Sequence, residues 1–221
     1  QLFTINDLIP GGSTYYRNSV PENRYLVWWG DECVEQDIHE CRIINKQDGS
    51  TQTLVTLEQM NDILTKAGHK PIHHLYDTTF PYAGKTFALI TLSHEKVLVD
   101  WTENKVVWHA TLSPEAGNTD WNKPSKSIAY TIDHNLFVLT ADGKSHQVSS
   151  DGSIDLVYGE SVHRDEFGIS KGTFWSPDGT LLAFYKMDQS MVSKFPQVNI
   201  TLPSQTPDAE SRIATTTPDP Y

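Results

Sequence analysis

The chain has 221 residues, and 17 Lys and Arg against 28 Asp and Glu give it a net charge of −11. This acidic balance argues against nucleic acid and anionic lipid surfaces as partners, because both require clustered basic side chains. With 38% hydrophobic and 10% aromatic residues, the chain can bury a core, which argues against wholesale disorder.

The first predicted elements are a helical turn from Thr4, which the Gly11-Gly12 pair breaks, and a polar stretch with two cysteines. Cys33 and Cys41 lie eight residues apart, a spacing that does not resemble a zinc site. Two alternatives stay open for this pair: a disulfide, or two unpaired thiols. The sequence predicts neither a metal site nor a cofactor.

One short helix is predicted to begin at Thr56 and to end at Gly68. Thr56 and Gln59 form a capping box, in which Thr56 accepts a backbone hydrogen bond and Gln59 reaches back to the cap. The helix carries an apolar stripe that is expected to pack on the core, formed by Leu57, Met60, Ile63 and Leu64.

A repeated pattern runs through the rest of the chain: an aromatic residue, a polar turn and, eight residues after the aromatic, an Ala inside an apolar triplet. Its copies are 80–89, 121–130 and 175–184, with starts 41 and 54 residues apart, close to the roughly 40–50 residues of a propeller blade. Further hairpins follow the triplets, one with its turn at Asp142-Gly143.

This pattern predicts an all-β fold, a partial β-propeller of about three to four blades of four-stranded antiparallel sheets with one short inserted helix. An ordinary antiparallel sandwich would explain the strands but not the spacing. Residues 1–202 are assigned to the propeller. Residues 203–221, rich in Pro, Thr and Ser, are assigned to a loop or insertion that leads to further blades, because three or four blades do not close a ring.

Asp165 and Glu166 stand side by side in an irregular stretch, shortly before the turn sequence Ser176-Pro-Asp-Gly179. On such a stretch, two neighbouring carboxylates can converge on one cation. An ammonium group with three protons suits them, as at the free N-terminus of a peptide. The alternative is a solvated acidic turn, neutralised by Arg164.

The run from Val162 to Ala183 resembles the dipeptidyl peptidase IV family of prolyl oligopeptidase-type serine peptidases. In that family a glutamate pair precedes an aromatic residue and a Trp-Ser-Pro motif. The block 157–192 is most similar to bacterial prolyl tripeptidyl and dipeptidyl aminopeptidases. In register, Asp165 and Glu166 take the places of the two glutamates that hold the substrate amine. Glu166 is the stronger candidate, because Asp165 is one methylene shorter than glutamate.

The resemblance implies a serine exopeptidase that releases di- or tripeptides after proline, with peptides that have a free N-terminus as its partners. It implies a Ser-His-Asp triad in a C-terminal α/β-hydrolase domain of the same chain, so no catalytic residue is expected in these 221 residues. It also implies a periplasmic or outer-envelope location and a homodimer of the full-length protein.

Two other functions are compatible with parts of the sequence. A non-catalytic envelope propeller that binds a protein or peptide would explain the same fold. A glycosidase-type propeller with Asp165 and Glu166 as acid and base is disfavoured. Those roles require carboxyl groups roughly 5–9 Å apart across a sugar, a separation that adjacent residues rarely reach.

Overall fold

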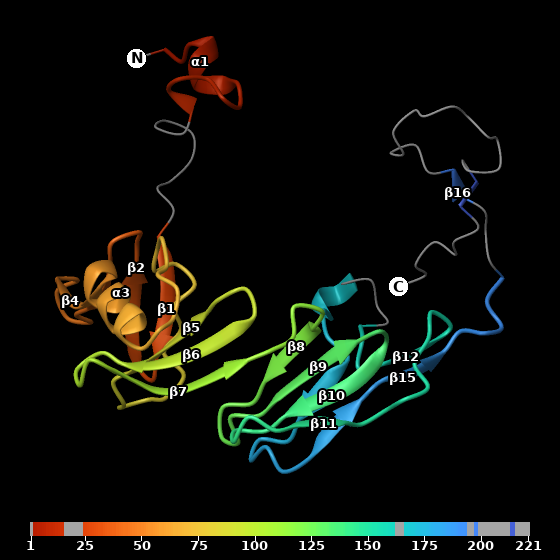
Figure 1. Ribbon diagram of the computed structural model, residues 1–221. Coiled ribbons are helices and arrows are strands. Elements are labelled where there is room, and N and C mark those ends of the chain that lie inside the picture. Colours follow the sequence, from red (N-terminus) through yellow and green to blue (C-terminus); the bar gives the residue numbers. More distant parts are fainter. Residues whose placement is uncertain (1, 16–23, 162–165, 194–196, 199–212, 215–221) are drawn as a thin grey trace. The chain divides into compact units, whose positions relative to one another are not determined.

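The computed structural model describes residues 2–15, 24–161, 166–193, 197–198 and 213–214 (Figure 1). The chain divides into two compact units, unit 1 (Gln1–Thr111) and unit 2 (Leu112–Tyr221). The described residues are mostly antiparallel sheet, so the predicted all-β class is confirmed. No helix among them is long and apolar enough to cross a membrane.

Unit 1 opens with the short helix α1 (Ile5–Leu8), whose N-cap is Thr4 as predicted. Two antiparallel sheets follow. The first has four strands in chain order: β1 (Tyr25–Trp29), β2 (Glu32–Gln36), β3 (Glu40–Ile44) and β4 (Thr51–Thr56). The second has three: β5 (Phe87–Thr91), β6 (Glu95–Asp100) and β7 (Lys105–Thr111).

Helix α3 (Leu57–Lys66) lies between the two sheets in the sequence. Thr56 Oγ1 accepts from Gln59 N at 3.2 Å, as the capping box requires. The other half of the predicted box is wrong, because the Gln59 side chain donates to Trp101 O and Asn104 Oδ1 instead. The apolar stripe packs on the core of unit 1 as expected, with Met60, Ile63 and Leu64 buried and Leu57 partly buried.

The two cysteines remain free thiols, so the disulfide alternative for Cys33 and Cys41 was wrong. In the β2–β3 register Cys41 lies opposite Gln36, while Cys33 lies opposite Ile44. Cys33 and Gln36 are three residues apart on one strand, so their side chains project from opposite faces. Cys41 is therefore on the core face, where burial raises its thiol pKa to about 12, and Cys33 is on the other face.

Unit 2 contains a four-stranded sheet and three pairs of strands among its described residues (Figure 1). The sheet has the order β11-β10-β9-β8, with strands β8 (Gly117–Trp121), β9 (Ile128–Ile132), β10 (Asn135–Leu139) and β11 (Ser145–Gln147). Two of the pairs are β12 (Leu156–Tyr158) with β15 (Lys186–Asp188), and β13 (Thr173–Trp175) with β14 (Leu182–Phe184).

The remaining pair is β16 (Gln197–Val198) with β17 (Ile213–Ala214). Strand β17 falls inside the segment assigned to a loop or insertion, whose proposed start at residue 203 lies outside the described residues.

The three repeat copies each place their apolar triplet on a strand: β5, β9 and β14. In unit 2, Trp121 pairs with Ile128 and Trp175 pairs with Leu182, so both copies are the hairpins that the pattern predicts. Ala88 is fully buried in the copy of unit 1.

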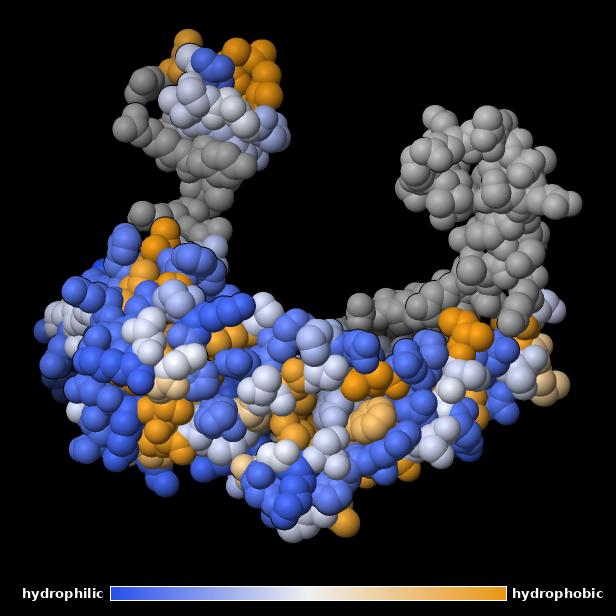
Figure 2. All heavy atoms as spheres, in the orientation of Figure 1, coloured by the Kyte–Doolittle hydropathy of each residue, from blue (hydrophilic) through white to orange (hydrophobic). Residues whose placement is uncertain are grey.

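Hydrophobic side chains also reach the surface. Figure 2 shows apolar patches separated by hydrophilic residues on the face in view. In unit 1, Trp28 shares the face of Cys33 and is 68% exposed, whereas its neighbour Trp29 packs on the core with Trp101. Exposed aromatic side chains on a strand mark a sheet face that the described residues of the same unit leave uncovered.

Candidate functional site: an acidic loop of unit 2

The predicted amine-binding pair belongs to the segment that joins β12 to β13, residues 159–172, here called the acidic loop. Asp165 lies outside the described residues. Glu166 begins the single 3-10 turn η1 (Glu166–Gly168), and only its backbone is described. The convergence of these two carboxylates on a free amine therefore stays a prediction, and the described residues on either side show how the loop is held.

The two ends of the acidic loop meet at a narrow stem. A Cβ atom on Gly172 would overlap the carbonyl oxygen of Glu160, so no residue with a side chain fits this close approach. Further along the loop, Ser161 Oγ donates to Ile169 O at 3.1 Å and joins its two arms. The loop therefore leaves and re-enters the fold at one place, as Ω-loops do.

Main-chain hydrogen bonds continue this stem into the β-structure. Gly159 N donates to Tyr185 O at 2.8 Å, and Tyr185 N donates to Gly172 O at 2.9 Å. Tyr185 thus lies between the two ends of the loop and bonds to both. The stem is as well anchored as a strand pair, although its residues belong to no regular strand.

The downstream arm is tied to strand β8 through Asp120, whose side chain is 15% exposed. Both Asp120 carboxylate oxygens lie 3.0 Å from Lys171 Nζ, and Oδ2 also accepts from Thr173 Oγ1 at 3.0 Å. Trp175 Nε1 adds a hydrogen bond to the Asp120 carbonyl oxygen at 3.1 Å. One residue of the neighbouring sheet therefore positions three residues at the end of the loop.

A second side-chain contact holds the upstream arm. Here the acidic side chain belongs to the loop, whereas in the first contact it belongs to the sheet. His134 Nδ1, in the turn between β9 and β10, lies 3.1 Å from Glu160 Oε1. The two side chains are 35% and 24% exposed. A partly exposed pair of this kind adds little stability, but it fixes the direction in which the loop leaves β12. Both arms are thus held by the same four-stranded sheet.

Phe167, near the tip of the loop, combines an uncommon backbone conformation with an exposed apolar side chain. Phe167 has a φ of 56°, a left-handed conformation that is uncommon for an aromatic residue. Its side chain is 94% exposed. Both features occur next to Glu166, and strained residues of this kind concentrate at ligand-binding sites. The described part of the loop tip therefore exposes an apolar ring that a ligand can contact.

Other chemistries find less support in the described residues. No group of three or more His, Cys, Asp or Glu among them could hold a metal ion. The loop does contain Gly168-Ile-Ser170-Lys-Gly172, a Gly-x-Ser-x-Gly pattern that the sequence-based interpretation overlooked. A nucleophile elbow joins a strand to a helix, whereas here strand β13 follows. Ser170 is therefore not in the setting of a catalytic serine.

Comparison with known proteins places this loop inside a recognised region. The family model described as "Dipeptidyl peptidase IV (DPP IV) N-terminal region" matches residues 90–213, which include the whole acidic loop. Dipeptidyl aminopeptidase B of Saccharomyces cerevisiae is 38% identical over 84 residues, covering 34% of this chain and 10% of that protein. The matched stretch therefore spans about a tenth of the length of this curated relative.

A solved structure matches over a longer stretch. It is a Bacteroides ovatus protein named as a candidate dipeptidyl aminopeptidase IV, with 38% identity and a TM-score of 0.76. The match covers 90% of this chain and 27% of that one. Both units are thus included in the likeness, while most of the solved protein has no counterpart in these residues.

Proposed function

Because the chain belongs to the dipeptidyl peptidase IV family, we propose that it is the substrate-gating part of a serine exopeptidase and recognises the substrate's N-terminus. Its antiparallel sheets form part of a β-propeller, which confirms the predicted fold class. The nucleophile, base and oxyanion hole are supplied by an α/β-hydrolase domain elsewhere in the same polypeptide. The full-length enzyme releases di- or tripeptides, after proline.

In this proposal the acidic loop is the amine clamp. Glu166, assisted by Asp165, pairs with the ammonium group of the substrate. The scissile bond then lies a set number of residues from that group, and this produces exopeptidase rather than endopeptidase action. The supporting observation is the closed stem of the loop, with both arms tied to one sheet by Asp120 and His134. Amine-binding carboxylates must be held in a fixed position to place the scissile bond correctly, and a firmly held loop stem meets this requirement.

The assay compares free with N-acetylated proline-containing chromogenic substrates, using the full-length protein. Glu166→Gln removes the charge but keeps the shape, and losing a desolvated charge pair typically costs 2–5 kcal/mol. At 1.4 kcal/mol per tenfold, kcat/KM for the free-amine substrate should therefore fall roughly 30-fold or more. Asp165→Asn should have a smaller effect, and Asp151→Asn, an exposed carboxylate outside the loop, should have none.

Three results would contradict the proposal in whole or in part. If acetylated substrates are cleaved as fast as free ones, or Glu166→Gln leaves the preference unchanged, the acidic pair is a solvated turn. If the full-length protein cleaves neither substrate, the binding-only propeller becomes the better proposal. Comparison of di- and tripeptide substrates then decides the length of the released product.

The same proposal places the full-length enzyme in the periplasm or outer envelope, where it meets exogenous peptides, and as a homodimer. Cell fractionation tests the location, and light scattering of the purified full-length protein tests the oligomeric state.

A further inference from the structure

The second sheet of unit 1 has an incomplete edge. Thr79 exchanges two main-chain hydrogen bonds with Leu89 of β5, at 3.1 and 2.8 Å, and no other described residue pairs with β5 on that side. Toward the end of the strand, Leu92 N donates to Glu95 O at 2.8 Å, on the β6 side. Backbone groups alternate along an antiparallel strand. The N–H and C=O of Thr91 therefore face away from β6, and no described residue hydrogen-bonds either of them.

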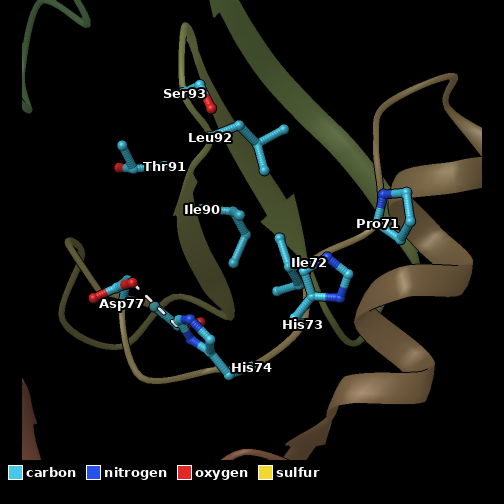
Figure 3. Close-up of a pocket in the computed structure, with 10 residues that line it drawn as sticks. Pro71, Ile72, His73, His74, Asp77, Ile90, Thr91, Leu92 and Ser93 are labelled. Atoms are coloured by element: carbon cyan, nitrogen blue, oxygen red, sulfur yellow. Dashed lines mark ion pairs between the residues drawn. The ribbon is translucent and has the colours of Figure 1, made fainter.

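The chain before Thr79 does not continue alongside β5. It turns away, with Thr78 N donating to Leu75 O at 3.1 Å, and leaves a cavity of about 310 Å³ between this turn and the end of β5 (Figure 3). The predicted fourth strand of this sheet is thus replaced by one bridging residue and an opening. Apolar and polar side chains both line the cavity, among them Ile72, His74, Asp77, Thr78, Ile90 and Leu92.

The irregular wall of this cavity is held in place by two side-chain amides. Asn61 of α3 bonds both main-chain groups of Ile72, at 2.9 and 2.8 Å. Gln36, which is 6% exposed, donates to Leu75 O at 3.1 Å and Thr78 O at 2.6 Å. The wall therefore cannot collapse onto β5 without breaking buried hydrogen bonds, and the cavity is preorganised.

A buried hydroxyl at the cavity has no partner. Thr78 is 2% exposed, and its Oγ1 forms no hydrogen bond with any described residue. Leaving such a group unsatisfied is unfavourable. This hydroxyl is enclosed by the protein and does not reach the opening, so the groups left for a ligand there are the N–H and C=O of Thr91. A ligand with alternating main-chain donors and acceptors satisfies this arrangement.

We propose that this cavity binds a soluble peptide in extended conformation, which continues the interrupted strand. One of its residues exchanges two antiparallel main-chain hydrogen bonds with Thr91, as Thr79 does with Leu89. A side chain of the peptide packs against Ile72 and Leu92, which line the cavity and are partly exposed. The cavity is at the lower end of the size range of small-ligand sites, which suits two or three residues.

An exposed carboxylate at the edge of the cavity favours a basic peptide. Asp77 is 80% exposed on its side chain, and its Oδ2 lies 4.0 Å from Nδ1 of the His74 ring (Figure 3). A Lys or Arg beside this carboxylate gains the charge complementarity that guides association. The site lies wholly in unit 1 and does not depend on the amine clamp proposed for the acidic loop.

The test uses the full-length protein and a fluorescein-labelled peptide, acetyl-Lys-Val-Thr-Val-amide, in fluorescence anisotropy. Acetylation removes the free amine, so binding at the proposed clamp is avoided. Two further probes carry N-methyl groups on alternate amides, one set for each edge of the strand. We expect saturable binding that one N-methylated probe loses and the other keeps, because only one edge pairs with Thr91.

Substitutions at Thr91 and Thr78 test which groups of the cavity contact the peptide. Thr91→Pro removes only an outward-facing N–H, a substitution that edge strands tolerate, and should weaken binding at least tenfold, whereas Thr91→Val should leave it unchanged. Thr78→Val removes a hydroxyl that is enclosed by the protein, so it is the matched control and should leave binding unchanged. If Thr91→Pro fails to fold, the methylated probes still decide. Absence of saturable binding at millimolar peptide, or equal binding of all three probes, would overturn the proposal.

Discussion

The β8–β9 and β13–β14 hairpins of unit 2 start from the same sequence pattern and end in different surroundings. In each, a Trp pairs with the first residue of the apolar triplet. Ala129 of the first hairpin is fully buried in a cluster with Leu136 and Tyr158. Ala183, the matching residue of the second hairpin, is exposed, and its pairing partner Phe174 is 38% exposed.

The difference shows which features are local and which depend on neighbours. Turn chemistry and strand alternation are enough to form both hairpins. Burial of the Ala requires a second sheet against it, and among the described residues of unit 2 only the first hairpin has one. Trp175 and Leu182, on the other face of the second hairpin, pack against the Ala129 cluster, so this hairpin has one covered and one open face.

The largest expected effect comes from enlarging the two alanines. Ala129→Leu overpacks a closed cluster and should lower the free energy of unfolding by about 1–3 kcal/mol. Ala183→Leu adds the same atoms to an open face and should change it by less than about 0.5 kcal/mol. Urea unfolding of each variant measures the difference. Equal losses would mean that the open face of the second hairpin is covered in the protein.

A smaller effect is expected at Asp120, which links the two hairpins. Asp120→Asn keeps the shape but removes the charge that faces Lys171, and we expect a loss of about 1 kcal/mol, since the pair is only partly buried. Glu103→Gln is the control, because its pair with Lys105 is 4.0 Å long and exposed. If both substitutions have the same effect in urea unfolding, Asp120 does not hold the acidic loop.

The smallest effect is a difference in acid sensitivity between the two turns. Hydrogen bonds from Ser176 and Thr180 hold the pKa of Asp178 below its usual value. The folded-state pKa is then below the unfolded one, so this stabilisation is present above roughly pH 4 and is lost as the pH falls through the folded-state pKa. In the first hairpin the neutral amide of Asn122 accepts the equivalent bonds from Ser125.

Hydrogen exchange at pH 6 and pH 3, corrected for intrinsic rates, measures this contrast. Protection of Gly179 N, which donates to Ser176 O, should fall in acid, while protection of Asn122 N in the first hairpin should not. Asp178→Asn should remove the pH dependence. Parallel loss of protection in both hairpins would show that acid acts on the whole unit instead.

Local chemistry explains which parts of the fold were predictable from the sequence. The Asp142-Gly143 turn, the start of α3 at Thr56 and the three triplet strands depend on residues close together in the chain, and all are found. The cysteine pair was ambiguous because spacing alone gives no strand register. Only the β2–β3 pairing shows that Cys33 and Cys41 point to opposite faces.

The identity of the candidate site residues stays a prediction from the sequence, and the contacts that hold their loop were not predicted. The motif located Asp165 and Glu166 from neighbouring residues. The contacts that hold their loop join residues far apart in sequence: Asp120 is 51 residues from Lys171, and His134 is 26 from Glu160. No local pattern indicates such pairs. The gap beside Thr91 was equally invisible, because an absent strand leaves no sequence signal of its own.

The separation of the two thiols gives the molecule a built-in labelling position. Reagents such as maleimides and mercurials attack the thiolate, and burial disfavours this form of Cys41 by raising its pKa to about 12. Cys33 is partly exposed on the opposite face. A spectroscopic probe or a heavy atom will therefore attach at a single, known point of the first sheet, without any engineered cysteine.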